Sequence, residues 1–454
     1  MTLSRSSVLF YNDFAAGPEA EVGGPFHFSR DSSKWVLGRD GLYHQARAGQ
    51  YGMHWENLVG QASAPPYRRP ALLVEPGYSD NIVGNTAEFV TASGWNISSY
   101  SAVAATSIFA DAAMQGWAAA FTWSSGGGAI YKGAGNLSGS KETYVCICEE
   151  VSAGRSIGAI RDNSMGSEYQ VQMDWSTYTV TDHGPLALDD FGYVDMGRGP
   201  NGGRLFLLWF MFTGTSGNLR QIKFYPDADK AGDTTILHYC NVQDKAGFGS
   251  LLPGDGSTTL SRATEVGGQN VYWDAFQHLP AAGLAFYWEY IFHGVWATYS
   301  DTIRLGDDSS GYDPHVRCEM HNNFPDTSLY FVYHESGGQV ARSQAITGIQ
   351  PGDRIQQVGV IFNDGSIMQI SAHEGGQATG TGVSAALSGG YQTLGHPAVS
   401  LVPFDAASVG ALALKVVDLG DLDSAGLLGP GISNADAQTV LDELADFHLD
   451  AAAY

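Results

Sequence analysis

The chain has 454 residues, of which only 15% are charged, and its formal net charge is −24. This length suits two domains with full cores better than one. A surface this negative repels phosphate groups, which argues against nucleic-acid binding and against binding to an anionic membrane. The simplest interpretation of the charge is solubility at high copy number.

The composition favours strands over helices. Hydrophobic residues make up 44% of the chain and aromatic residues 12%, and there are 58 glycines. Low charge with many glycines and aromatics is typical of short strands joined by tight turns. The longest apolar run, Leu205–Phe212, is too short to span a bilayer as a helix and predicts a strand buried on both faces.

The cysteines do not form a disulfide framework in a chain of this size, and we expect them to be buried free thiols. They are Cys146, Cys148, Cys240 and Cys318. No second pair lies at the spacing of a zinc site. The first residues lack the apolar core of a signal peptide, so we expect synthesis in a reducing cytoplasm and no membrane insertion.

Residues 1–70 have no sustained hydrophobic period, and we interpret them as an extended arm that packs on a neighbour. Gly38–Gly41 has the composition of a hairpin turn between two short strands. Consecutive prolines in Ala64–Tyr67 favour an extended, unpaired chain and mark a boundary.

Residues 71–262 carry repeated strand signals separated by Gly, Asn, Asp and Ser clusters, which predicts an antiparallel sandwich. Asp111–Trp117 is the one segment there that predicts a short helical turn. The predicted strands are 118–123, 142–149, 169–173, 177–181, 205–212, 221–225 and 235–241.

Residues 263–454 repeat this pattern and predict a second sandwich. Its clearest hairpin runs from Arg354 to His373, with Gly365 supplying the positive φ that the turn needs. The other predicted strands are 284–291, 295–299, 302–305, 315–321, 329–334 and 412–418.

The chain ends with one predicted helix. Ser433 is placed as its N-cap, with Asp436 three residues later. An apolar stripe at helical spacing should dock against the second sandwich. The stripe consists of Ala437, Val440, Leu441, Leu444 and Phe447.

Two segments, 72–96 and 236–265, look like the opening and closing of one sandwich unit, and they carry a family resemblance. The quoted residues are Ala71–Glu75, Asp80–Ile82, Gly94–Trp95, Val242–Gln243, Gly247, Ser250–Pro253, Gly256–Thr258 and Ser261–Thr264, with Gly24–Arg30 upstream. They resemble a family of tailed-phage virion proteins that contain a carbohydrate-binding-module-like jelly roll. From about residue 270 the chain looks like a concanavalin-A-like, laminin-G-type sandwich.

The expected fold is therefore all-β: two tandem antiparallel β-sandwiches of jelly-roll type, an extended N-terminal arm and one short C-terminal helix. The resemblance implies a bacteriophage virion structural protein (a tail fibre, head spike or capsid decoration) at the virion surface, assembled in the host cytoplasm and released by lysis. It also implies contact with host-surface glycans. We expect attachment to other virion proteins through the arm, and a homotrimer.

The sequence predicts no enzyme. A retaining glycosidase needs two carboxylates about 5 Å apart, and the motif E-x-D-x-x-E is absent. The zinc-protease motif H-E-x-x-H does not occur either. Glu289 with His293, and Glu319 with His321, are interpreted as rim or core residues. A polysaccharide depolymerase and a capsid cement protein without a ligand remain as alternatives.

Calcium is the one cofactor for which the sequence offers ligands. Asp227, Asp229 and Asp233 begin like an EF-hand loop, but Ala231 and His238 replace expected oxygen ligands. A hairpin-loop Ca²⁺ site built from these three aspartates is left open, beside the simpler interpretation of solvated loop carboxylates.

Sugar binding needs exposed aromatic rings with polar groups beside them. Trp175 and Tyr178 lie in a polar setting and are predicted to be exposed. Trp296, Tyr299 and Asp301 form the second candidate group for glycan contact.

Overall fold

The computed structural model describes most of the chain, with gaps. The described residues are 3, 8–13, 28–29, 33–48, 53–57, 68–74, 78–80, 86–90, 94–135, 141–163, 165–214, 220–243, 246–247, 250–254, 260–262, 266–267, 271–272, 280–295, 299–306, 315–321, 327–335, 338–373, 377–383, 398–400, 407–423 and 426–447.

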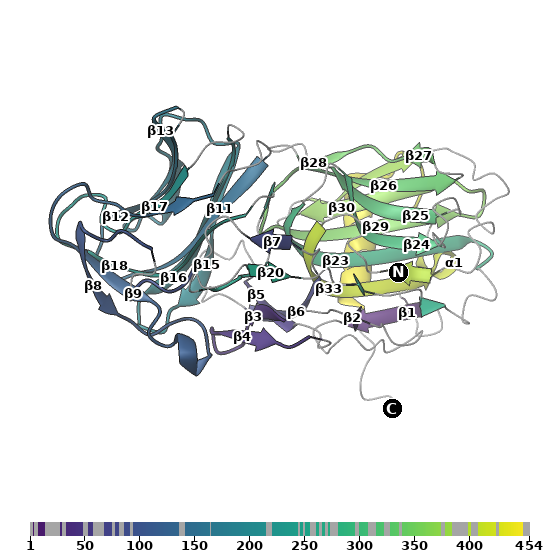
Figure 1. Cartoon of the computed structure of the whole chain (residues 1–454). Helices are drawn as coiled ribbons and strands as arrows, with labels where there is room; N and C mark the ends of the chain where they lie inside the picture. The colour runs from purple at the N-terminus through teal and green to yellow at the C-terminus, as the bar shows by residue number, and fades with distance from the viewer. Residues whose placement is uncertain are drawn as a thin grey trace.

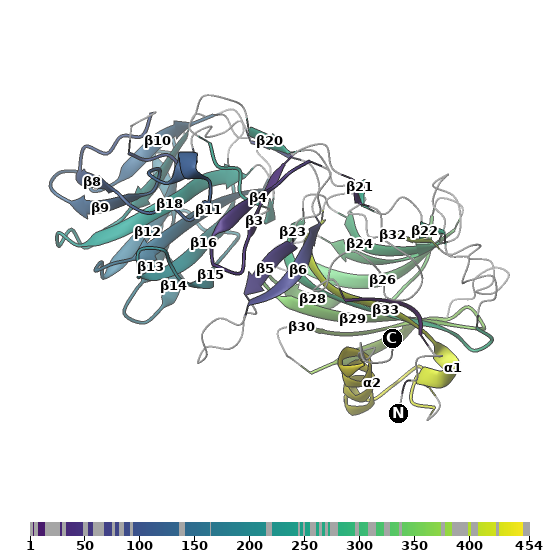
Figure 2. The same ribbon diagram turned by 90° about the horizontal axis from the view of Figure 1, so that it is seen from below.

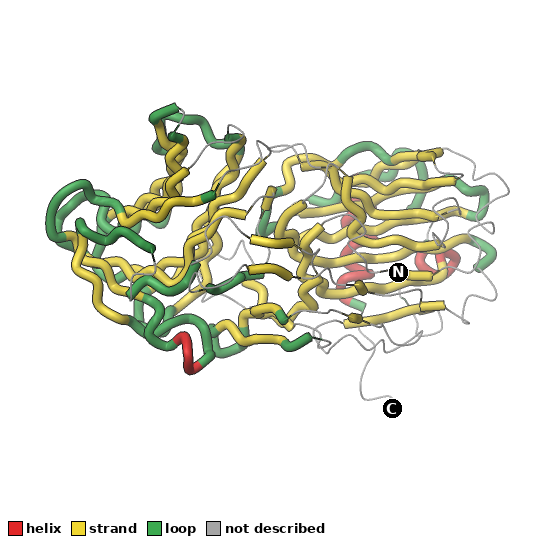
Figure 3. Tube along the Cα trace, in the orientation of Figure 1, coloured by secondary structure: helices red, strands yellow, loops and turns green. Residues whose placement is uncertain are grey.

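The predicted fold class is confirmed. The described chain is almost entirely antiparallel β-structure, arranged as two β-sandwiches that lie side by side (Figures 1 and 3). The helical elements are η2 (Ala112–Met114), α1 (Leu419–Leu422) and α2 (Asn434–Asp446). The turn predicted near residue 111 is therefore a 3₁₀ helix, and the Asp111 side chain caps it.

The first sandwich packs a six-stranded sheet against a five-stranded sheet. The six-stranded sheet has the order β15 (Asp190–Arg198), β16 (Arg204–Thr213), β11 (Lys141–Glu150), β18 (Thr234–Gln243), β9 (Ala119–Trp123), β8 (Tyr100–Ala104). The five-stranded sheet has the order β10 (Ile130–Ala134), β17 (Arg220–Tyr225), β12 (Arg155–Asp162), β13 (Ser167–Asp174), β14 (Thr179–Asp182).

Strand β16 confirms the prediction for the longest apolar run. Its even-numbered side chains Phe206, Leu208, Phe210 and Phe212 lie in the core between the two sheets. Its odd-numbered side chains Leu205, Leu207, Trp209 and Met211 join a second cluster on the opposite face. Because successive side chains of a strand point to opposite faces, an uninterrupted apolar run is what a doubly covered strand requires.

The second sandwich packs a nine-stranded sheet against a seven-stranded sheet. The nine-stranded sheet has the order β31 (Thr379–Val383), β30 (Ile367–His373), β29 (Arg354–Phe362), β23 (Gly283–Val295), β33 (Ala407–Asp418), β6 (Arg68–Val74), β5 (Met53–Asn57), with β1 (Val8–Asp13) on β33 and β19 (Ala246–Gly247) on β23. The seven-stranded sheet has the order β22 (Val271–Tyr272), β32 (Ala398–Ser400), β24 (Tyr299–Gly306), β25 (His315–His321), β26 (Thr327–Glu335), β27 (Gly338–Arg342), with β28 (Ile346–Ile349) on β26.

Two predicted local structures in this sandwich are confirmed. Strands β29 and β30 form the expected hairpin, and Gly365 has a φ of 86° in its turn. Helix α2 begins after Ser433, whose Oγ accepts a hydrogen bond from the Asp436 amide at 3.1 Å. The predicted stripe packs on the nine-stranded sheet, and its first four residues are buried. Figure 2 shows α1 and α2 below this sheet.

Three short strand pairs complete the described β-structure. They are β2 (Phe28–Ser29) with β21 (Val266–Gly267), β7 (Tyr78–Asp80) with β20 (Leu260–Arg262), and β3 (Lys34–Leu37) with β4 (Tyr43–Ala46). The pairing of β7 with β20 brings the predicted opening and closing segments together. The backbone amide and carbonyl of Thr86 bind Gly254 and Cys240, which ties the same two segments again.

The strand pairing does not follow the predicted ranges 1–70, 71–262 and 263–454. Strand β6 crosses the first boundary and pairs with β33, so the predicted opening strand of the first sandwich belongs to a sheet of the second. Strand β1 also pairs with β33. The β3–β4 hairpin packs against Phe109 through Trp35 and Tyr43. The described parts of the N-terminal arm thus pack on their own chain.

The four cysteines are free and buried, as predicted. In the part of the chain that the structure describes, no helix is long and apolar enough to cross a membrane.

Candidate functional site

Trp175 does not have the exposure that the sequence predicted. Only 2% of the residue is exposed, and its indole N–H donates to Ser156 Oγ at 2.9 Å. Its ring meets Phe206 edge-on at 5.3 Å. The surrounding Asp, Ser and Thr form the turn between β13 and β14, and the indole points from this polar turn into the sandwich core. The polar neighbours therefore reflect the turn and not the environment of the ring.

Tyr178 is half-buried in the same turn, with a positive φ of 52°. Its ring stacks on Phe206 at 5.6 Å, and the Arg204 guanidinium lies 4.3 Å from the ring centroid. Its hydroxyl donates to Glu150 Oε2 at 3.2 Å. Both the face and the hydroxyl of Tyr178 already contact this chain, so little of the ring remains for a sugar.

The second predicted group lies on β24 only in part. Trp296 and the Tyr299 side chain lie outside the described residues, although the strand register places Tyr299 opposite His321. Asp301 is 3% exposed and binds Arg304 Nη2 at 2.6 Å. Asp301 is thus the carboxylate of an internal ion pair.

Two of the three aspartates predicted for calcium, Asp227 and Asp229, have separate structural roles. Asp227 is buried, and its Oδ2 accepts the amides of Gly232 and Asp233 at 2.9 and 3.0 Å, which closes the loop between β17 and β18. Asp229 pairs with Arg155. Within the described ranges, no group of three or more His, Cys, Asp or Glu side chains has the arrangement of a metal site.

A different polar cluster lies on the outer face of the five-stranded sheet. Glu168 is its centre: Lys223 Nζ donates to Oε1 at 2.6 Å, while Gln170 Nε2 and the Tyr225 hydroxyl donate to Oε2 at 2.7 and 3.0 Å. These side chains come from β13 and β17, which flank β12. Three donors from two strands converge on one carboxylate, which fixes the positions of all four groups. We call this set, together with Tyr131, the platform.

Tyr131 extends the platform onto the edge strand β10. It lies opposite Lys223 in the strand register, and Lys223 Nζ is 6.0 Å from its ring centroid. Its hydroxyl accepts from Asn96 Nδ2 at 2.7 Å. Tyr131 and Tyr225 are both half-buried.

The platform favours an ionised carboxylate at neutral pH. Burial alone would raise the pKa of Glu168, but the hydrogen bonds from Lys223 and Gln170 outweigh it, and the pKa lies below its ordinary value. Burial and the Glu168 charge raise the pKa of Tyr225, which keeps its phenol protonated. The platform therefore combines a fixed acceptor, a cation that is only 8% exposed and two half-buried aromatic residues on one sheet face.

A second polar set, which we call the ion chain, crosses the seven-stranded sheet. Asp301 and Glu319 lie directly opposite each other on β24 and β25, and both bind Arg317. Arg304 binds Asp301 at one end of the set. At the other end Glu319 contacts His321, which in turn binds Arg342.

The histidine of the ion chain has a defined tautomer. Arg342 Nη2 donates to His321 Nδ1 at 3.1 Å, so the ring proton lies on Nε2 and points to Glu319. Burial lowers the pKa of His321, although Glu319 opposes this shift. Burial also raises the pKa of Asp301, which Arg317 and Arg304 partly offset. Positive and negative side chains therefore alternate along the set.

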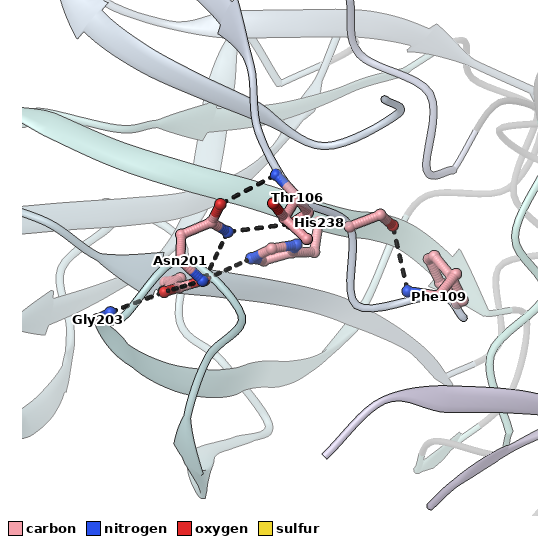
Figure 4. Close-up of polar contacts among 7 residues, drawn as sticks. Thr106, Phe109, Asn201, Gly203 and His238 are labelled. Carbon is pink, nitrogen blue, oxygen red and sulfur yellow. Dashed lines mark hydrogen bonds and ion pairs between the residues drawn. The ribbon is translucent and has the colours of Figure 1, made fainter. Parts of the chain in front are cut away.

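A third polar set is buried in the six-stranded sheet (Figure 4). Glu149 accepts the amides of Asn201 and Gly203 at 3.0 and 2.8 Å, and His238 Nε2 lies 3.1 Å from its Oε2. Asn201 also bonds both backbone groups of Thr106. Glu149 and His238 are fully buried. This arrangement holds the β15–β16 turn in place.

The comparisons with known proteins give no family. No family model matches the chain, and no curated protein matches it. A solved structure with some similarity is a mutant of the GH43 protein BlXynB from Bacillus licheniformis, at 11% identity and a TM-score of 0.24, covering 85% of this chain and 74% of that chain.

Sequence reasoning did not single out the platform, although one signal for it is present. In Gln221–Tyr225 the residues alternate, so Ile222 and Phe224 predict the core face while Lys223 and Tyr225 predict the other face. This strand is β17, and its pairing with β12 and β10 brings Glu168 and Tyr131 near. Nothing in the local sequence of β17 indicates that pairing.

Proposed function

We propose that this protein is a non-enzymatic structural protein of a bacteriophage virion, a fibre, spike or capsid decoration, that contacts glycans on the host surface. The resemblance of segments 72–96 and 236–265 to tailed-phage virion proteins supports the virion role and the location at the virion surface. Two all-β sandwiches suit that role, although this architecture hosts many functions.

The platform is the observation that carries the glycan contact. A pyranose ring has an apolar face that stacks on aromatic rings, and hydroxyls that need fixed donors and acceptors. Tyr131 and Tyr225 supply the rings, and Glu168, Gln170 and Lys223 supply the polar groups. Since internal hydrogen bonds hold the polar groups in place, a bound sugar meets a preorganised surface and costs less ordering entropy.

The proposal is tested by binding of the fluorescently labelled protein to intact host cells, with and without periodate oxidation of the surface sugars. We expect saturable binding that periodate abolishes and that Tyr131→Ala weakens at least about tenfold, the scale of one lost ring contact. Tyr193→Ala is the matched control, because Tyr193 is a 38% exposed tyrosine on the other sheet of the same sandwich. Absence of binding to any host surface would leave the capsid cement protein as the better account.

The second candidate is the polysaccharide depolymerase, which needs a pair of carboxylates. Asp301 and Glu319 are a carboxylate pair on adjacent strands, which the sequence alone did not locate. Arg317 bridges the two carboxylates and both are at most 3% exposed, so in this structure the pair is closed to a substrate. Release of reducing ends from host capsule that is lost in Glu319→Gln would establish the depolymerase.

Attachment to other virion proteins through residues 1–70 belongs to the same proposal. Strand β1 and the β3–β4 hairpin pack within the chain. The contact with other virion proteins would therefore use the side chains of these strands that remain exposed. Gln45→Arg, at an exposed position of β4, should leave the fold intact and reduce incorporation into particles. The homotrimer expected from the sequence is an alternative to the dimer proposed below, and the mass measurement described there decides between the two.

A further inference from the structure

We propose that strand β8 is a docking edge for a second copy of this chain, through antiparallel pairing of β8 with β8 about a twofold axis at Val103. This inference concerns assembly and does not depend on the glycan proposal. Strand β8 ends the six-stranded sheet, at the end of the molecule away from α1 and α2 (Figures 1 and 2). No described strand pairs with its outer edge.

The backbone of β8 presents the groups that such pairing needs. The Ala105 amide donates to the Ala118 carbonyl at 2.8 Å, so residues 105, 103 and 101 direct their hydrogen bonds to β9. By the same alternation, Ala102 and Ala104 direct their N–H and C=O groups outward. Unpaired edge groups of this kind are a template for another strand.

Both ends of this outer edge are engaged: the Tyr100 amide donates to the Ile97 carbonyl at 2.9 Å, and Asn201 caps the far end. The Asn201 amide bonds both the N–H and the C=O of Thr106, at 2.9 and 3.0 Å, which imitates a neighbouring strand. Because Asn201 bonds both backbone groups of Thr106, the outward N–H and C=O groups of the even-numbered residues here are aligned for strand pairing. The cap stops at Thr106, which leaves the stretch centred on Val103 open.

The side chains of β8 do not oppose pairing. Val103 is 66% exposed, and Ser101 and Ala104 are also exposed. The sequence contains no charged residue between Glu88 and Asp111. Natural edge strands are normally blunted by charges, prolines or bulges, and β8 has none of these in Tyr100–Ala104.

The other edges of the first sandwich are protected in those ways. Strand β10 carries Lys132, and its backbone is bridged to Asn96. Strand β14 ends in Asp182. Strand β15 contains two aspartates and a bulge at residues 195–197. Only β8 among these four edges lacks a charged residue, which makes it the favoured docking edge.

The position of the twofold axis follows from Ala102 and Ala104, whose backbone groups point outward. Pairing centred on Val103 sets Ala102 of each copy opposite Ala104 of the other, so that four backbone hydrogen bonds form. The two Val103 residues then form a non-hydrogen-bonded pair, with Cα atoms about 4.5 Å apart. A strand paired with its own copy is an isologous contact that closes as a dimer. The contact is small, so we expect a weak dimer.

Cysteine cross-linking tests this geometry directly. The four native thiols are fully buried, so Val103→Cys introduces the only accessible thiol in the described chain. The expected Cα separation lies within the range that a disulfide spans. With copper phenanthroline and dissolved oxygen, which accepts the two electrons, we expect a cross-linked dimer. Val151→Cys, at a 53% exposed valine outside β8, is the control and should not cross-link. Failure of folded Val103→Cys to cross-link overturns the proposal.

Light scattering gives the independent readout. A dimer of the 48.4 kDa chain has twice that mass, 96.8 kDa. We expect a dimer fraction that rises with salt, since salt screens the repulsion between two chains of charge −24. Val103→Lys should weaken dimerisation more than about tenfold, because it sets like charges directly opposite each other. A trimer, or a dimer that Val103→Lys leaves unchanged, contradicts the proposal.

Discussion

Asp190 is a carboxylate whose charge the fold tolerates poorly, and Asp190→Asn should stabilise the protein at neutral pH. Its Oδ1 accepts the Phe191 amide at 2.8 Å, but Oδ2 is buried without a hydrogen-bond partner. Burial raises the pKa of Asp190 from 3.8 to about 6, and the negative charge of Asp353 adds to the shift. The group is 9% exposed, at the edge strand of the first sandwich.

The size of the expected stabilisation follows from this pKa shift. From 3.8 to about 6 is roughly 2 pKa units, and at 1.36 kcal/mol per unit the charged form costs about 3 kcal/mol. Solvent at the rim of the strand screens part of this energy, so we expect a gain of about 1–3 kcal/mol from Asp190→Asn.

The direction of the pKa shift of Asp190 determines how stability depends on pH. Because the folded pKa is raised, the native state binds more protons than the unfolded state between pH 3.8 and about 6, and stability falls as pH rises through this window. The gain from Asp190→Asn is therefore complete above about pH 6 and absent below 3.8, where both side chains are neutral.

Urea denaturation at pH 7.5 and pH 4 measures both effects. Asp189→Asn is the control, since Asp189 accepts a hydrogen bond from Thr213 Oγ1 at 2.7 Å and should show no such gain. A variant Asp190→Asn that is no more stable than the wild type at pH 7.5, or whose gain is independent of pH, would refute the reasoning.

Three further predictions concern stability. Trp175→Ala should cost about 3–5 kcal/mol in urea denaturation because it removes a buried indole; a loss under 1 kcal/mol would show that the ring is exposed after all. Gly203→Ala should cost about 2 kcal/mol or more in thermal melts, since its Cβ would lie 1.8 Å from the Glu150 carbonyl oxygen. Gly127→Ala, with open space around it, is the control and should be neutral in the same melts. Arg317→Met should cost about 3 kcal/mol because it leaves two buried carboxylates without their shared cation, and a neutral result in denaturation would mean that the ion chain adds nothing.

The sequence predicts the local structure of this chain well, because period and turn chemistry are local. Strand β16, the β29–β30 hairpin and helix α2 each carry their signal within a few residues. The pairing of β1 and β6 with β33 has no such signal, since residues hundreds apart in the sequence meet there. Any apolar strand of suitable length satisfies the same local pattern. The predicted domain boundaries therefore missed the pairing of β1 and β6 with β33.

The candidate sites were harder to predict for a related reason. Trp175 lies among polar residues that belong to a turn, and a turn does not determine where the ring points. The platform depends on Glu168 reaching Lys223 from two strands away, across β12. A single sequence shows which residues share a strand face, but not which faces adjoin.

The central claim is that the platform binds host glycans, and its most direct test compares Tyr131→Ala with Tyr193→Ala in the host-cell binding assay. We predict that periodate abolishes wild-type binding, that Tyr131→Ala loses at least about tenfold in affinity with an unchanged melting temperature, and that Tyr193→Ala binds like the wild type. Glycan-dependent binding that Tyr131→Ala leaves intact would place the sugar site elsewhere and contradict the account.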